Sequence, residues 1–246
     1  MPAMPAWPPK SLPRLYVRNP LGDGMSVELD RAQANYLGNV LRLGEGAQLL
    51  LFDGSSGEWL ARIRECGKKH MLLAVEAKIR EPETIPDVWL AFAPVKRTQT
   101  DWLVEKATEI GAARLMPVIT QRTIVDRVKL DRLEAITIEA AEQCGRTILP
   151  HIDKPVPLGR FLRDRDEERL LYFADECGGA PAREAMKAGP ALILTGPEGG
   201  FSDEERQQVR GSANVKAISL GPRILRAETA ALAALAAFMA IAGDWR

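Results

Sequence analysis

Two glycine-containing loops near the carboxyl end of the chain carry residue types that could bind a ligand. The first, LTGPEGGFSDEE, begins at Leu194, and the second, SLGPRILRAETAAL, begins at Ser219. Each follows a short apolar run and leads into a helix-like pattern. Glycine has no Cβ, so the backbone at Gly196, Gly199 and Gly200 can turn sharply and approach a ligand closely. Two successive strand–loop–helix turns indicate one composite ligand site.

The first loop does not have the composition of a phosphate site. It contains neither G-x-x-x-x-G-K-[ST] nor G-x-G-x-x-G. The acidic residues Asp203, Glu204 and Glu205 follow it, and they would offset the positive helix end that attracts phosphate. Ser202 and Glu205 form a capping box that starts a helix at Asp203. A neutral or cationic ligand held by backbone groups fits better, and S-adenosylmethionine (SAM) meets that description. The alternative is a tight turn without a ligand.

The second loop combines Arg223 and Arg226 with Glu228. Two cations beside a cofactor loop suit an anionic partner. Alternatively, the arginines are solvated and Glu228 stabilises the start of the following helix. That helix, 228–242, is apolar almost all round, which indicates burial on more than one side. A central helix and a homodimer interface both satisfy this pattern.

The composition of the 246 residues is that of a soluble globular protein, with 46% hydrophobic and 27% charged residues. The formal net charge is zero, so nucleic-acid binding would depend on local patches. Cys66, Cys144 and Cys177 lie far apart without C-x-x-C spacing, which argues against a disulfide framework or a zinc site and favours a reducing cytoplasm. His70 and His151 have no ligand-like spacing, so no metal site is expected.

Neither residues 1–13 nor the most apolar stretch of the sequence has the pattern expected of a membrane signal. Residues 1–13 are rich in proline, lack the apolar core of a signal peptide, and are expected to form a flexible tail. The most apolar stretch, 230–242, is shorter than the roughly 20 residues that cross a bilayer. We therefore expect a cytoplasmic protein with no membrane segment.

Residues 14–80 show short apolar runs separated by turn signals, which is typical of a small β-barrel or sandwich. The expected strands are 14–17, 26–29, 47–52, 58–63 and 71–77, with a helix over 31–43 that stops at Gly44. A charged, proline-bearing stretch, 81–87, is the predicted linker.

Residues 88–246 alternate apolar runs with helical patterns, which predicts an α/β domain whose parallel sheet is covered on both faces. The expected strands are 88–93, 114–119, 170–174, 191–195 and 215–220, and the expected helices include 101–110 and 129–144.

The two loops closely resemble the signatures of the bacterial 16S ribosomal RNA (uracil-N3)-methyltransferases, which belong to the SPOUT, or alpha/beta-knot, superfamily. The matching segments are GPEGGFSDEE and LGPRILRAETAAL. The likeness continues through APVKRTQTDWLVEKATEIGA (93–112), IEAAEQCGR (138–146) and NYLGNVLRLGEGAQLLLFDGSSGEW (35–59). It therefore covers nearly the whole chain, in the right order.

This resemblance implies a PUA-like RNA-binding β-barrel over 14–80 and a SPOUT methyltransferase domain over 88–246 with a C-terminal trefoil knot. It also implies a homodimer with SAM as cofactor and 16S rRNA, within the 30S subunit, as substrate. The product would be 3-methyluridine. The alternatives are a related knotted methyltransferase with another RNA target and a non-catalytic RNA-binding or ribosome-assembly protein.

The resemblance also suggests roles for particular residues. The residues expected to bind the cofactor are Leu194, Thr195, Gly196, Pro197, Glu198, Gly199, Gly200, Leu220, Gly221, Ile224, Leu225 and Arg226. Arg226 would stabilise the anionic uracil, and Glu198 or Glu228 would accept its proton. An ion pair between Arg226 and Glu228 that only caps the helix is the alternative.

For RNA docking the sequence offers cations near strand ends and in the N-terminal domain. The candidates are Arg14, Arg18, Arg42, Lys96, Arg97 and Arg146. A solvated charged face is the alternative for any one of them. If they form a cluster, RNA affinity should fall with salt according to the number of phosphates contacted.

Overall fold

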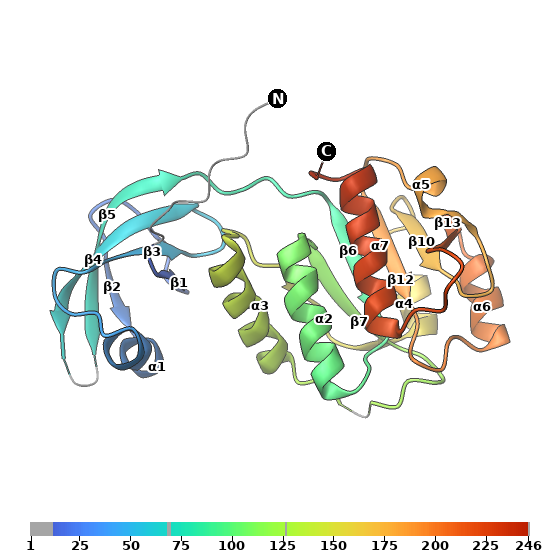
Figure 1. The fold of residues 1–246 in the computed structure, drawn as a ribbon, viewed down its shortest axis with the longest axis horizontal. Coiled ribbons are helices and arrows are strands. Elements are labelled where there is room, and N and C mark those ends of the chain that lie inside the picture. The colour runs from blue at the N-terminus through green and yellow to red at the C-terminus, as the bar shows by residue number, and fades with distance from the viewer. Residues whose placement is uncertain (1–11, 68–69, 126, 246) are drawn as a thin grey trace. The chain divides into compact units, whose positions relative to one another are not determined.

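The protein is described by a computed structural model that covers residues 12–67, 70–125 and 127–245 (Figure 1). These residues divide into two compact units. The first contains the described residues up to Glu83 together with 145–148, and the second contains 84–144 and the residues from Leu149 onward. Most of the predicted proline-rich tail, residues 1–11, lies outside the described residues.

The first unit is built on a five-stranded sheet in the order β1-β3-β4-β5-β2. β1 runs parallel to β3, and the other neighbours are antiparallel. Register shifts along β4 mark irregularities of the kind that bend a strand. The strands are β1 (Arg14–Tyr16), β2 (Ser26–Leu29), β3 (Gln48–Phe52), β4 (Glu58–Cys66) and β5 (Met71–Arg80).

A short helical segment follows β2 and differs from the single helix expected over 31–43. α1 (Arg31–Asn35) starts with a capping box between Asp30 and Gln33, but the chain then continues as a π-helical segment, Tyr36–Val40. Leu37 in this segment is fully buried in the core of the first unit. Pi-helical turns are rare and have no distinct sequence pattern, so hydrophobic spacing did not reveal this one.

Residues 145–148 were expected in the second domain but cluster with the first unit. The reason is a set of polar contacts. The Glu83 carboxylate accepts the backbone N–H groups of Thr147 and Ile148 at 3.0 and 3.1 Å. The guanidinium groups of Arg80 and Arg14 donate to the carbonyls of Gly145 and Arg146. Hydrogen bonds between residues more than 60 positions apart leave no local trace in the sequence.

The second unit contains an all-parallel sheet in the order β11-β13-β10-β12-β6-β7-β8, with β9 paired to β7. The main strands are β6 (Val88–Phe92), β7 (Arg114–Ile119), β10 (Leu170–Ala174), β12 (Ala191–Thr195) and β13 (Val215–Ser219), and the two-residue strands are β8 (His151–Ile152), β9 (Val156–Pro157) and β11 (Ala180–Pro181). The helices are α2 (Arg97–Ile110), α3 (Leu130–Cys144), α4 (Leu158–Asp164), α5 (Ala182–Ala185), α6 (Asp203–Arg210) and α7 (Ala227–Ile241).

Alternating side chains of the strands pack in two separate cores, one on each face of this sheet. In β12, Ile193 packs with residues of α2, α3, α5 and α7, whereas Leu192 and Leu194 pack with residues of α4 and α6. Figure 1 shows α2, α3 and α7 side by side. Since neighbouring residues of a strand point to opposite faces, this division confirms a sheet covered on both sides. None of the described helices is long and apolar enough to span a lipid bilayer.

The register of the central strands brings three loops together. Phe173 of β10 lies opposite Leu194 of β12, and Ala174 lies opposite Ile218 of β13. All three strands therefore end at the same edge of the sheet. In open parallel sheets this carboxyl edge is where ligands bind.

Candidate functional site

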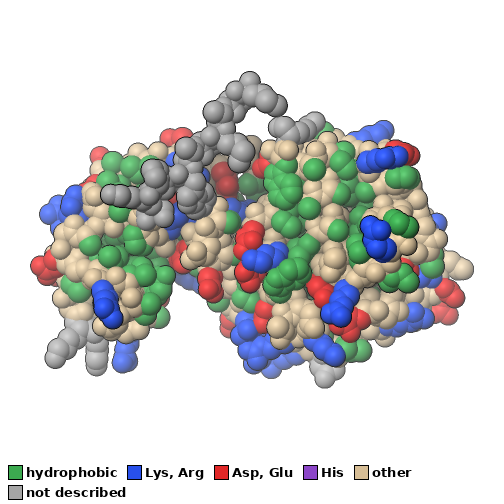
Figure 2. Space-filling view, viewed as in Figure 1, with side chains coloured by type: hydrophobic (Ala, Val, Ile, Leu, Met, Phe, Trp, Pro, Cys, Tyr) green, Lys and Arg blue, Asp and Glu red, His purple; other side chains and the backbone are tan. Residues whose placement is uncertain are grey.

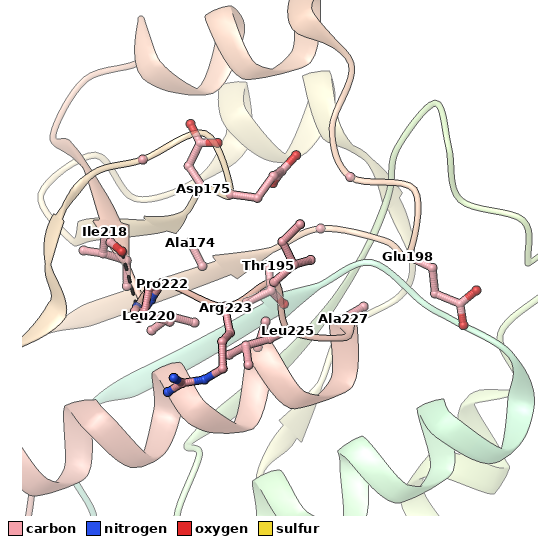
Figure 3. Close-up of a pocket in the computed structure, with 18 of the residues that line it drawn as sticks. Ala174, Asp175, Thr195, Glu198, Ile218, Leu220, Pro222, Arg223, Leu225 and Ala227 are labelled. Carbon is pink, nitrogen blue, oxygen red and sulfur yellow. Dashed lines mark hydrogen bonds between the residues drawn. The ribbon is translucent and has the colours of Figure 1, made fainter.

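The loops that follow β10, β12 and β13 enclose a cavity at this carboxyl edge, closed on one side by the first turn of α7 (Figure 3). The lining residues are Ala174, Asp175, Glu176, Gly178, Thr195, Gly196, Pro197, Glu198, Gly200, Ile218, Ser219, Leu220, Gly221, Pro222, Arg223, Ile224, Leu225, Ala227 and Ala230. Three loops that lie apart in the sequence therefore form one site.

The loop after β12 is shaped by its glycines and by the start of α6. The N–H of Gly200 donates to the Pro197 carbonyl at 2.9 Å, and Gly200 has a φ of 66° in the left-handed region. Ser202 caps α6 by accepting the N–H of Glu205, while the Glu205 carboxylate accepts the N–H of Ser202. The predicted capping box and the helix start at Asp203 are confirmed. A Cβ on Gly196 would approach the ring of buried Phe201 to 2.6 Å, so the turn requires glycine.

The loop after β13 makes fewer stabilising contacts than the loop after β12. Gly221 has a φ of 112°, and its N–H donates to the Ser219 hydroxyl at 3.3 Å. Ile224 is 93% exposed. α7 then begins with Arg226 at its N-cap, and the Arg226 side chain makes no capping hydrogen bond to the free N–H groups of the first turn. Such groups carry a positive partial charge and are available to a ligand.

The cavity combines an apolar wall with polar groups. Ile218, Leu220 and Leu225 contribute apolar side chains, and Asp175 and Glu176 contribute carboxylates. Figure 3 shows Glu198 on the side away from Ile218 and Leu220. The apolar part suits an adenine ring, and the carboxylates suit the hydroxyl, ammonium and sulfonium groups of SAM. The residues present therefore fit this cofactor.

A second hollow adjoins the first and shares Glu198, Ile224 and Leu225 with it. Its remaining lining residues are Lys96, Gln99 and Arg226. Lys96 and Arg226 are both exposed and stand at the N-cap positions of α2 and α7. Two cations and two helix N-termini make this hollow favourable for a group that acquires negative charge.

Comparison with known proteins agrees with this architecture. Residues 81–239 match the family model of the RNA methyltransferase domain, and residues 29–76 match that of the RNA methyltransferase PUA domain. The chain belongs to the RNA methyltransferase family. The resemblance drawn from the sequence is confirmed, as is the fold class of a PUA-type domain followed by a parallel α/β domain.

Individual relatives cover nearly the whole methyltransferase. The chain is 32% identical to ribosomal RNA small subunit methyltransferase E of Rickettsia conorii over 228 residues, 91% of this chain and 93% of the relative. A crystal structure of the enzyme of that name from Neisseria gonorrhoeae, bound to SAM, aligns with a TM-score of 0.87 at 30% identity, covering 96% of this chain and all of that one. A SAM-bound structure from Legionella pneumophila aligns with a TM-score of 0.88 at 32% identity and the same coverage.

Most of the residues predicted to bind the cofactor line the cavity of the methyltransferase. They are Thr195, Gly196, Pro197, Glu198, Gly200, Leu220, Gly221, Ile224 and Leu225. Leu194 does not, because its side chain is fully buried with Phe173 and Phe201 in the core. Gly199 lies beside the cavity, where its carbonyl accepts the Arg122 guanidinium at 2.8 Å. Arg226 lines only the second hollow.

The prediction missed the loop after β10. Asp175, Glu176 and Gly178 line the cavity from this loop, and Asp175 is 4% exposed. A signal was present in the sequence, since two acidic residues directly follow the apolar run 170–174. Only the strand order reveals that this strand lies between the two that carry the glycine loops.

The three predicted catalytic residues separate in the structure. Arg226 and Glu198 share the second hollow, but Glu228 lines neither hollow. Glu228 is 7% exposed in the first turn of α7, and its Oε2 atom is buried without a hydrogen-bond partner. No Arg226–Glu228 ion pair forms within the described residues, although Glu228 does lie in the first turn of α7, where an acidic side chain stabilises a helix start.

Two of the predicted RNA-docking arginines are engaged in the first unit instead. The Arg14 guanidinium is 2.6 Å from the Glu58 carboxylate and lies 4.6 Å from the centroid of the Phe52 ring. Arg146 is 5% exposed and lies 3.5 Å from the Glu83 carboxylate. Both side chains are withdrawn from solvent. The remaining candidates, Arg18, Arg42, Lys96 and Arg97, are exposed.

The second unit presents further cations beside the start of α2. Arg97, Arg127, Lys129 and Arg132 line a small hollow there, together with apolar side chains such as Val95. Figure 2 shows Lys and Arg side chains gathered along the lower edge of this unit. A local cluster of cations can attract a polyanion even though the net charge of the whole chain is zero.

Proposed function

We propose that this enzyme transfers the methyl group of SAM to N3 of a uridine in 16S rRNA. The observation that carries the proposal is the pair of adjoining hollows. One combines an apolar wall with carboxylates, which suits SAM, and the other holds Lys96 and Arg226. The names of relatives that align over nearly the full chain support small-subunit ribosomal RNA as the substrate.

The chemistry explains why the second hollow is cationic. Bound SAM supplies an electrophilic methyl group on a sulfonium. Uracil N3 is protonated at neutral pH and lies on the Watson–Crick edge, so the target base must be unpaired or flipped out. Arg226 and Lys96 would stabilise the uracil anion as N3 loses its proton. Exposed Glu198, which lines both hollows, would accept that proton.

Within the cofactor hollow, the loops would hold SAM so that its methyl group faces the second hollow. The turn at Gly196–Gly200 would approach the cofactor with backbone groups, and Leu220 and Leu225 would pack against the adenine. Holding the methyl carbon and N3 in line at near-attack distance supplies much of the rate enhancement of such a displacement.

We further propose that the working form is a homodimer that acts in the cytoplasm on the 30S subunit. The second unit exposes large apolar side chains, with Ile224 at 93% and Trp102 at 44% exposure. Covering such side chains with a second copy would remove apolar surface from water. Sedimentation of the purified protein at micromolar concentration should give twice the mass of one chain.

The test of the activity is a methyl-transfer assay with tritiated SAM on 30S particles and on free 16S rRNA, with product nucleosides identified by mass spectrometry. We expect 3-methyluridine, formed faster on 30S particles. Methylation of a different nucleoside would indicate a related enzyme with another target. Tight RNA binding without any transfer would indicate a non-catalytic assembly protein, and either result would contradict the proposal.

A further inference from the structure

α6 carries two arginines one helical turn apart that both contact the loop after β10. Arg206 donates from Nε to Asp175 Oδ1 at 3.1 Å and from a terminal nitrogen to Glu176 Oε1 at 2.7 Å. Arg210 donates from Nε to Asp175 Oδ2 at 2.8 Å and from a terminal nitrogen to the Gly178 carbonyl at 2.6 Å. Both oxygens of Asp175 are therefore occupied by guanidinium groups.

These contacts centre on a carboxylate with no access to water, while the outer partners Arg210 and Glu176 are 44% and 41% exposed. The Asp175 side chain is fully buried, and that of Arg206 is 15% exposed. A buried carboxylate is costly unless it is paired and hydrogen-bonded. Burial acts to lower the pKa of Arg206, but its hydrogen bonds to Glu176 and Asp175 outweigh this and raise it. The guanidinium therefore stays charged.

The same helix also holds the other loops at this edge of the sheet. Glu205 Oε1 accepts the backbone N–H of Gln121, in the loop after β7, at 2.8 Å, and its Oε2 accepts that of Ser202 at 3.0 Å. Arg206 reaches the Phe201 carbonyl at 3.4 Å. A Cβ on Gly200 would lie 2.5 Å from Glu176 Oε1, so the loops after β10 and β12 meet there.

Neither arginine lines the cofactor cavity, whereas Asp175, Glu176 and Gly178, which they hold, all do. We propose that Arg206 and Arg210 are positioning residues that fix the 175–178 loop in the conformation that binds SAM. This rests on the proposed function, since it assigns SAM to the cavity. Without the arginines, Asp175 and Glu176 repel each other and the buried carboxylate moves toward water. The loop must then become ordered when SAM binds, and the free-energy cost of this ordering weakens binding.

The test measures SAM affinity without RNA, by titration calorimetry, for Arg206→Gln and Arg210→Gln. We expect the Kd for SAM to rise about ten- to a hundredfold, while turnover at saturating SAM and the KM for RNA stay within about threefold of wild type. Arg206→Lys should restore part of the affinity, because lysine keeps the charge but loses the fork that spans both carboxylates.

Asp203→Asn is the matched control. Asp203 also pairs with Arg206, at 2.8 Å, but its side chain is 95% exposed and it does not line the cavity. We expect wild-type affinity for SAM. A double-mutant cycle between Arg210→Gln and Asp175→Asn should give a coupling in SAM affinity that a cycle between Arg206→Gln and Asp203→Asn lacks.

Unchanged SAM affinity in the glutamine variants, with only a lower Tm, would overturn the proposal. It would leave the arginines a purely structural role. If a glutamine variant fails to fold, SAM affinity is measured for Arg206→Lys and Asp175→Asn instead. Wild-type affinity in both variants would overturn the proposal equally. A wild-type protein that binds no SAM would overturn the proposed function as well, so the two failures are distinguishable.

Discussion

At the residue scale, the position of Arg226 decides what it can do. It is exposed at the N-cap of α7 and lines the hollow next to the cofactor cavity rather than the cavity itself. An arginine there adds its charge to that of the helix end, beside the hollow that we propose for the uracil anion. Glu228, two residues later, is turned into the protein, because a helix places such neighbours on different faces.

Replacing Arg226 should therefore affect turnover more than cofactor binding. We expect Arg226→Ala to lower kcat by about 10²- to 10³-fold, the loss typical of removing one donor that stabilises a developing anion. The Kd for SAM should change less than threefold. Tritium transfer at saturating SAM measures the first, and calorimetry measures the second.

The control is Arg183→Ala, because Arg183 is an exposed arginine whose side chain pairs with the adjacent Glu184 at 3.4 Å and lines neither hollow. Its turnover should equal that of wild type. If Arg226→Ala also retained full turnover, the role assigned to Arg226 would be wrong.

At the element scale, the turn between β3 and β4 is stabilised by one carboxylate. Asp53 Oδ1 accepts the N–H groups of Ser55 and Ser56 at 2.8 and 2.7 Å, and Oδ2 accepts that of Leu21 at 3.0 Å. Burial acts to raise the pKa of Asp53, but the hydrogen bonds from Ser56, Ser55 and Leu21 outweigh it, so the pKa lies below its ordinary value of 3.8.

This lowered pKa fixes the sign of a pH effect. A group whose pKa falls on folding contributes stability above its unfolded pKa, and that contribution is lost as the pH falls through the folded value. Asp53→Asn should lower the free energy of unfolding by about 1–3 kcal/mol at pH 7. The difference from wild type should shrink below about pH 4.

Urea denaturation between pH 7 and pH 3 measures this effect. Asp23→Asn provides the comparison, since Asp23 is exposed in the loop between β1 and β2 and makes no side-chain hydrogen bond within the described residues. A penalty for Asp53→Asn that stays constant with pH would show that its charge is irrelevant.

At the scale of the whole molecule, RNA binding must come from local clusters, because the formal net charge is zero. Exposed Arg42 in the first unit and Arg97 in the second are free to meet phosphates, Arg97 having only a loose 4.0 Å pair with Asp101. We expect Arg42→Ala and Arg97→Ala each to reduce the slope of log affinity for RNA against log salt by about one.

Arg14→Ala should behave differently. Its ion pair with Glu58 is nearly buried, with side chains 8% and 7% exposed. Because Arg80 still lies 3.4 Å from Glu58, removing Arg14 should lower the free energy of unfolding by about 1–3 kcal/mol. Filter binding between 50 and 200 mM salt measures the slopes, and thermal denaturation measures stability. Unchanged slopes for both surface variants would argue that neither side chain contacts a phosphate.

Much of the architecture was predictable from the sequence because its signals are local. The capping box joins Ser202 to Glu205 within one turn, and the alternation of apolar runs with helical patterns needs only a short window. The strands β6, β7, β10, β12 and β13 accordingly begin where expected. Short elements such as α4 and α5 escaped, since four to seven residues carry too little periodicity. The C-terminal knot remains a prediction of the resemblance.

The sequence by itself determined the order of strands and helices, the two glycine loops and the resemblance to a methyltransferase family. The tertiary structure alone decided that the loop after β10 completes the cofactor cavity, that Arg226 belongs to a separate hollow, and that Arg14 and Arg146 are buried. The physical reason is distance along the chain. Glu58 lies 44 positions from Arg14. Tertiary packing determines which residues so far apart become partners, and a short stretch of sequence carries no information about it.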